Sequence, residues 1–200
     1  MDARKIDIRP TIDQSKKYKD LGADVFYDGK ECKVIQHKGG LAKRANALRS
    51  IINDLKECEA YVDLLHKDNS NVISGGLHKA LVITYGKCFS QGDSRGLSLD
   101  KTKVLKGGDH EILKSHSGII EMRNKFVAHS DHDEFDCGEV SVVLPPDGME
   151  SLKGCVLTVN QKYGSYPKEA LVKVSGLLAY VLCYTTNELN NCSSAILKMA

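Results

Sequence analysis

Residues 41–66, LAKRANALRSIINDLKECEAYVDLLH, decide the fold class of this 200-residue chain. Apolar side chains recur in this stretch every three or four residues, which is the spacing of one face of an α-helix. The face comprises Leu41, Ala45, Leu48, Ile52, Leu55, Val62 and Leu65. Because a long amphipathic helix must bury its apolar face against other helices, the stretch predicts a helical bundle.

The same helical period returns in three later stretches, at residues 72–89, 109–129 and 167–189. The polar cluster at 68–71 offers an N-cap to the first of them, and Asp109 offers one to the second. Two β-like runs, at 140–144 and 155–159, are separated by a turn that contains Pro-Pro-Asp-Gly. We therefore expect a mainly α fold, an up-and-down helical bundle of four to five helices with a small β-hairpin-like element near residues 140–160.

The chain is long enough for one good core, so we expect one helical domain over residues 1–200. It would carry an N-terminal extension at 1–40 and a β-like arm at 138–165. Within the extension, Pro10 is expected to begin a short helix, and Asp28-Gly29 between apolar residues predicts a hairpin or turn. Residues 90–108 are rich in glycine and polar residues, which is typical of a mobile connection and unfavourable for a short helix.

Composition limits the classes of function. The net charge is +2, from 28 basic and 26 acidic residues, which gives no overall attraction to nucleic acid or anionic membrane. The sequence contains neither a signal-peptide core nor an apolar run long enough to cross a bilayer. The seven cysteines form no CxxC pair, which is typical of reduced thiols and indicates a cytoplasmic protein. We also expect no cofactor, no metal and no membrane partner.

An arginine interrupts the apolar stripe of the helix at 109–129. Arg123 falls one heptad after His116, on the face formed by Ile112, Leu113, Ile119, Ile120, Phe126 and Val127. A guanidinium keeps its charge, so on this face it needs a water-filled cleft, a bound phosphate or an acidic partner. The acids expected within reach on a neighbouring helix are Asp54, Glu57 and Glu59.

Arg123, Asn124 and His129 form the candidate catalytic set. An arginine can hold a phosphate with two hydrogen bonds, and a histidine can transfer a proton near neutral pH. Together they suit RNA cleavage without metal, in which the 2′-hydroxyl attacks and a 2′,3′-cyclic phosphate remains. Six positions place Arg123 and His129 about 240° apart on an ideal helix, so the helix must loosen near the histidine. Otherwise His129 merely caps the helix C-terminus.

One histidine cannot serve as base and acid on opposite sides of one phosphorus. A second copy of the motif across a homodimer would supply the other histidine, so the motif predicts a homodimer with the site at the dimer cleft. His116 is a candidate supporting residue, although a histidine on an apolar stripe is more often a core residue.

Basic side chains could steer an RNA backbone towards the motif. Lys87 and Lys125 are the main candidates, and further basic residues cluster around the glycine-rich loop at Arg95, Lys101, Lys103, Lys106 and Lys114. A metal site is a weaker alternative, because the dense set of ligands lies in one loop without a second His or Cys group. Its members are His129, Asp131, His132, Asp133 and Asp136.

Residues 76–133 resemble the HEPN superfamily, and most closely its abortive-infection branch. The stretches that carry the resemblance are 77–81 (LHKAL), 85–90 (YGKCFS) and 122–131 (MRNKFVAHSD), with a polar loop before the last. The resemblance implies a HEPN-like helical domain that dimerises. It also implies a metal-independent endoribonuclease of toxin–antitoxin or phage-defence systems, with an R-x4-6-H motif at the dimer cleft. RNA and an antitoxin or defence-system protein would be its partners.

The resemblance assigns the motif arginine to Arg123, the polar residue that follows it to Asn124, and the motif histidine to His129. Ser130 and Asp131 follow the histidine, so the H-x-Y tyrosine that some HEPN toxins carry as a modification site is absent. Other branches of the superfamily have lost catalysis. The alternative is therefore an inactive HEPN module that binds nucleotide, RNA or a partner protein.

Overall fold

Helices dominate the part of the chain that the computed structural model describes, which is residues 6–10, 23–32, 34, 37–67, 70–90, 96–128, 136–145, 155–162 and 167–199. The helices are α1 (Gly40–Leu65), α2 (Asn71–Phe89), α3 (Lys101–Val104), α4 (His110–Ala128) and α5 (Lys168–Leu197). The strands are β1 (Ile6–Pro10), β2 (Ala23–Tyr27), β3 (Lys30–Glu31), β4 (Asp136–Val143) and β5 (Cys155–Lys162). The predicted mainly α fold with a small β element is confirmed.

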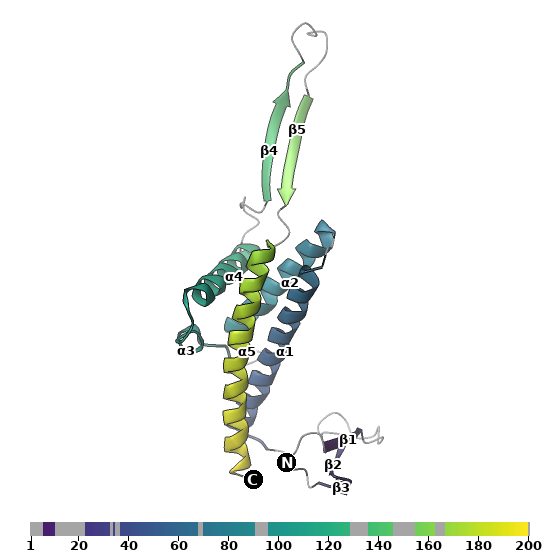
Figure 1. Ribbon diagram of the computed structural model, residues 1–200, viewed down its shortest axis with the longest axis vertical. Coiled ribbons are helices and arrows are strands. Elements are labelled where there is room, and N and C mark those ends of the chain that lie inside the picture. Colours follow the sequence, from purple (N-terminus) through teal and green to yellow (C-terminus); the bar gives the residue numbers. More distant parts are fainter. Residues whose placement is uncertain are drawn as a thin grey trace.

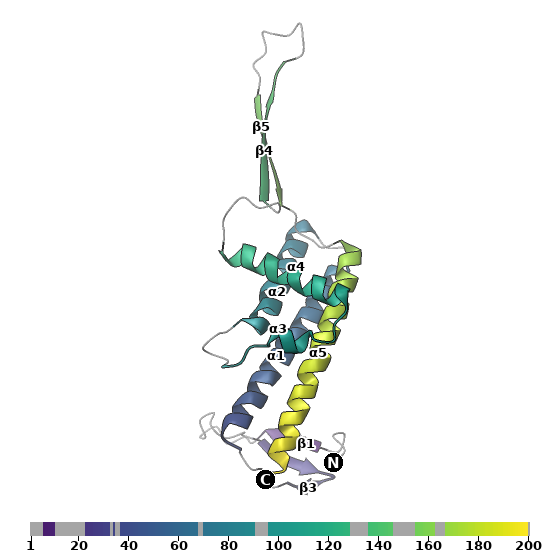
Figure 2. The same ribbon diagram turned by 90° about the vertical axis from the view of Figure 1, so that its left-hand side faces the viewer.

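The long helices form a bundle with one crossing member. α1 and α5 run side by side in opposite directions, and α2 packs on α1 (Figure 1). α4 packs on α2 and α5, but it runs across the bundle rather than along it, as Figure 2 shows. The short α3 lies between the ends of α2 and α4 in the chain. The crossing lays the Arg123 face of α4 over α2.

One core joins all five helices. Its fully buried side chains include Leu55 of α1, Tyr85 of α2, Ile119 of α4 and Leu177 of α5, with Val104 added by α3. A smaller cluster of Leu48, Ile52, Leu189 and Cys192 continues between α1 and α5. Leu113, which was expected on the buried stripe of α4, is 44% exposed. α4 therefore buries a narrower stripe than the sequence predicts, because it meets the bundle at an angle.

Side-chain caps fix where the helices begin. The Asp109 carboxylate accepts a hydrogen bond from the backbone N–H of Ile112 at 2.9 Å, and the Ser70 hydroxyl accepts one from Ile73 at 3.4 Å. Each cap satisfies a backbone donor that the first turn leaves without an intrahelical partner. Both caps are at positions that the sequence predicts.

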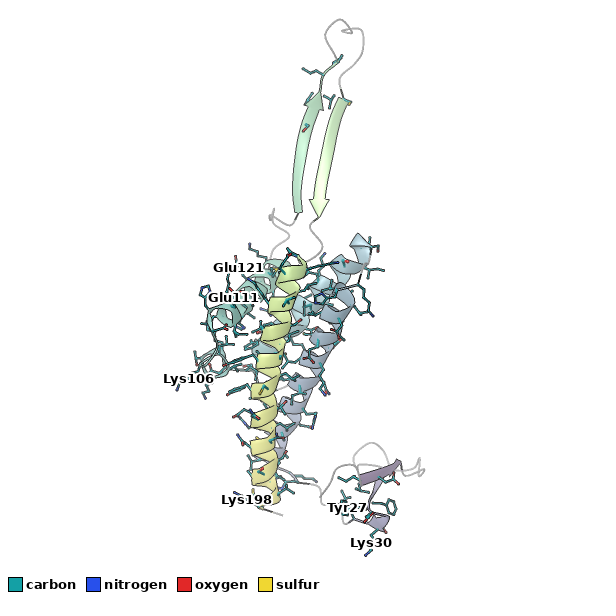
Figure 3. All side chains as sticks on the ribbon, in the orientation of Figure 1. Tyr27, Lys30, Lys106, Glu111, Glu121 and Lys198 are labelled. Atoms are coloured by element: carbon teal, nitrogen blue, oxygen red, sulfur yellow. The ribbon has the colours of Figure 1, made fainter. Side chains whose placement is uncertain are left out.

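The N-terminal strands form an antiparallel sheet in the order β1-β2-β3. Tyr27 pairs with Lys30 across a two-residue turn, and Figure 3 labels both side chains. The turn residues Asp28 and Gly29 have φ of 52° and 77°, as a tight hairpin requires. The predicted turn is confirmed. Pro10 is the last residue of β1 and pairs with Ala23, and the residues after it, over which a short helix was expected, lie outside the described part of the chain.

β4 and β5 form the predicted β-hairpin-like arm. The two strands pair antiparallel over their whole length, with Val140 opposite Thr158. Figure 1 shows the arm extending beyond the end of the bundle at which α5 begins. Over the described segments, no helix combines the length and apolar character that crossing a membrane requires.

Truncating the α1 core should unfold the chain more easily. Leu55→Ala should lower the free energy of unfolding by about 2–5 kcal/mol, because the leucine is fully buried and its removal leaves a cavity. Leu64→Ala is the control on the same helix, since Leu64 is 40% exposed and its loss should cost well under half as much. Urea denaturation measures both, and equal losses would contradict the packing of α1.

Candidate functional site

A cavity of about 220 Å³ lies where α2, α3 and α4 meet. Its lining combines two cations, one histidine and one hydroxyl with apolar side chains. The lining residues are Gly86, Phe89, Ser90, Leu99, Lys101, His116, Ile120 and Arg123. The predicted motif arginine thus faces a cavity together with His116, the histidine one heptad before it.

Among the described residues, Arg123 reaches the cavity without an acidic partner. Its guanidinium donates a hydrogen bond to the side-chain oxygen of Asn124 at 3.2 Å, and no carboxylate pairs with it in the described part of the chain. Two of the acids expected as partners are engaged elsewhere, Asp54 with Lys87 at 3.4 Å and Glu57 with Tyr61. Of the three explanations for this arginine, the neighbouring acid is therefore wrong for the described residues.

A glycine makes room for the arginine. A Cβ atom built on Gly86 would lie 2.7 Å from Cγ of Arg123 and 3.2 Å from its Cβ and Cδ. Real Cβ contacts are longer than the first of these distances, so the base of the arginine side chain rests directly on the α2 backbone. This close approach fixes the position at which the arginine side chain projects from α4.

Lys101 comes from the segment that the sequence predicted as a mobile connection. The prediction is wrong for residues 97–104, because the N–H of Leu99 donates to the carbonyl of Cys88 at 2.9 Å and Leu99 is buried. Asp100 then caps α3 by accepting hydrogen bonds from the backbone N–H and the hydroxyl of Thr102. These contacts hold Lys101, the first residue of α3, at the cavity.

His116 is almost fully buried in the cavity wall. The Tyr85 hydroxyl lies 2.9 Å from its Nδ1, and the Phe89 ring meets the imidazole edge-on with centroids 4.6 Å apart. Burial, and to a lesser extent the charge of Lys101, lowers the pKa of His116, so the imidazole is neutral at pH 7. Burial also raises the pKa of Tyr85, which keeps its hydroxyl protonated.

The cavity is suited to an anion. Lys101 and Arg123 bring two positive charges to a small space, and the lining residues that the structure describes include no carboxylate. Asp100, next to Lys101 in the chain, directs its carboxylate to the α3 cap. An anion with several acceptor oxygens would offset the repulsion between the two cations and accept their hydrogen bonds.

The other predicted site residues do not meet at this cavity. Asn124 is exposed beside Arg123 on α4, and Lys125 is paired with Glu121 at 3.5 Å, so neither lines it. α4 ends at Ala128, and the motif histidine His129 lies outside the described residues. So does most of the alternative metal cluster. Within the described ranges, no three metal-ligating side chains gather.

The sequence did not single out Lys101 as a site residue, because it is one of several basic residues in and around the glycine-rich loop. The Asp100-x-Thr102 cap was a local signal for the turn that positions it. Comparison with protein-family models, curated proteins and solved structures finds no match to this chain.

Proposed function

We propose that this protein is a HEPN-type endoribonuclease that cleaves RNA without a metal ion and acts as a toxin or phage-defence effector. One observation carries the proposal: Arg123 and Lys101 line a cavity to which none of the described lining residues brings a carboxylate. RNA presents one phosphate per nucleotide, and a phosphate oxygen is the acceptor that a guanidinium and an ammonium favour. The sequence resemblance supplies the rest of the argument, because Arg123 is also the motif arginine.

In the proposed reaction the 2′-hydroxyl of RNA attacks the adjacent phosphorus and the 5′-oxygen of the next nucleotide leaves. Arg123, assisted by Lys101, stabilises the negative charge that develops on the phosphorane oxygens. His129 removes the proton of the attacking hydroxyl or returns one to the leaving oxygen. The products are a 2′,3′-cyclic phosphate and a 5′-hydroxyl. Asn124, hydrogen-bonded to Arg123, orients the guanidinium.

A homodimer completes this proposal. The Arg123 cavity is built within one chain by α2, α3 and α4, so a second copy is not needed to bind phosphate. It is needed to supply the second proton-transferring histidine. A protein that stays monomeric at assay concentrations would contradict this part of the mechanism.

The second candidate is a catalytically inactive HEPN module that binds an RNA or nucleotide phosphate in the same cavity. A specific observation favours it, namely that Nδ1 of His116, the histidine in the cavity wall, is engaged at 2.9 Å by the buried hydroxyl of Tyr85. The cavity then holds binding groups, and catalysis depends entirely on His129.

Cleavage of a mixed-sequence RNA in EDTA tests the proposal. The wild-type protein should cut it, and His129→Ala should cut about 10²-fold or more slowly, the usual contribution of general acid–base catalysis. Fragment ends should carry a 2′,3′-cyclic phosphate. Binding without any cleavage would favour the inactive module, and loss of activity in EDTA would overturn the metal-free mechanism. His66→Ala, an exposed histidine at the end of α1, is the matched control.

A further inference from the structure

The His116 imidazole has a definite hydrogen-bonding partner on one side and the cavity on the other. The contact with the Tyr85 hydroxyl occupies Nδ1, and the described part of the chain offers Nε2 no further partner. The Nε2 atom is also not enclosed by surrounding protein atoms. Because His116 lines the cavity, Nε2 is open to it.

The direction of the Tyr85 hydrogen bond follows from counting donors and acceptors. The Tyr85 hydroxyl is fully buried, and His116 is its one hydrogen-bond partner among the described residues. If Nδ1 carried the proton and donated to the tyrosine oxygen, the hydroxyl hydrogen would be buried with no acceptor, which is costly. The hydroxyl therefore donates to Nδ1, and the neutral ring carries its proton on Nε2.

We propose that His116 is a third phosphate-binding residue of the cavity, a neutral Nε2–H donor that Tyr85 holds in a single tautomer. Nε2–H then donates to a phosphate oxygen beside Lys101 and Arg123. Tyr85 is the positioning residue, because it acts through His116 and does not line the cavity. The inference rests on the proposed function in taking this cavity as the site of an RNA phosphate.

The arrangement also separates the roles of the two histidines. In this tautomer Nε2 has no free lone pair, so His116 binds the phosphate and does not act as the base of the reaction. Its ring is held in place by the edge-on contacts of Tyr85 and Phe89. Proton transfer is left to His129.

A binding assay that cannot turn over tests the role of His116. The probe is an RNA oligonucleotide with 2′-O-methyl riboses, which lacks the attacking hydroxyl, and fluorescence anisotropy gives its Kd. The double variant Tyr85→Phe/His116→Phe removes donor and acceptor together, which should keep the core folded. It should bind the probe about tenfold or more weakly than wild type. His116→Gln, which retains an N–H, should recover most of the affinity.

Nitrogen-15 NMR of the full chain tests the role of Tyr85. The His116 ring should show the Nε2–H tautomer, and added inorganic phosphate should shift that resonance. Tyr85→Phe should yield a mixture of tautomers. An Nδ1–H tautomer in the wild type, or a double variant with unchanged probe affinity, would overturn the inference. These readouts are independent of cleavage. If the chain cuts RNA but its affinity for the probe does not depend on His116, the proposed function stands and the inference fails. If the probe binds through His116 but the chain never cuts RNA, the inference stands and the proposed function fails.

Discussion

Arg123→Ala is expected to lower RNA cleavage by about 10²–10³-fold, the usual consequence of removing one donor that stabilises charge in a transition state. Affinity for the uncleavable RNA should fall as well, by about 10-fold to 100-fold, since hydrogen bonds to charged groups contribute about 1.5–3 kcal/mol. Stability should change little, because the guanidinium has no ion pair in the described segments and its removal separates no pair of opposite charges.

Two further variants distinguish charge from geometry at this position. Arg123→Lys keeps the positive charge but loses the planar fork that binds two phosphate oxygens, so it should recover only part of the activity. Arg49→Ala removes an exposed arginine of α1 that does not line the cavity, and it should cleave as wild type does. If Arg123→Ala cleaved RNA at the wild-type rate, the phosphate assignment of the cavity would be wrong.

Added phosphate offers a second readout for the same variants. A ligand that binds only the folded chain raises its thermal unfolding midpoint, and the rise grows with the logarithm of the ratio of ligand concentration to Kd. Inorganic phosphate should therefore stabilise the wild type and Arg49→Ala, and it should stabilise Arg123→Ala much less. The difference should shrink at high salt, because screening weakens attraction at a site that is open to solvent.

Local sequence signals were sufficient for most of the fold. Helical periodicity located α1, α4 and α5, and the Asp109 cap marks the start of α4, where its carboxylate meets the N–H of Ile112. The Asp28-Gly29 turn was equally local, since two residues with positive φ specify it. Such features depend on residues only a few positions apart in the chain, so they can be predicted from a single sequence.

The cavity could be predicted only in part, because it depends on contacts between distant segments. Arg123 and His116 share a helical face, and that relation is visible in the sequence. Lys101 joins them through the backbone hydrogen bond between Leu99 and Cys88, which no local pattern encodes. The crossing of α4 over α2 is likewise a property of packing, and it decides which apolar positions of α4 are buried.

Gly86→Ala should have the second largest effect, although it adds a single methyl group. The new Cβ would lie 2.7 Å from Cγ of Arg123, so α4 or the arginine rotamer must shift. A displacement of about 1 Å at a positioned group can cost about 10²-fold in rate, and we expect a cleavage loss of that order. The overpacking should cost about 1–3 kcal/mol of stability, partly offset by the better helix propensity of alanine.

Gly76→Ala is the matched control, because it makes the same change in the same helix where an added Cβ meets nothing within 4 Å. It should stabilise the chain by about 0.4–1 kcal/mol and leave cleavage unchanged. A double-mutant cycle of Gly86→Ala with Arg123→Ala then isolates the contact, since truncating the arginine removes its Cγ and Cδ. In that background Gly86→Ala should lose most of its stability cost. Additive effects would mean that the methyl group meets some other part of α4, and the arginine would not owe its place to the glycine.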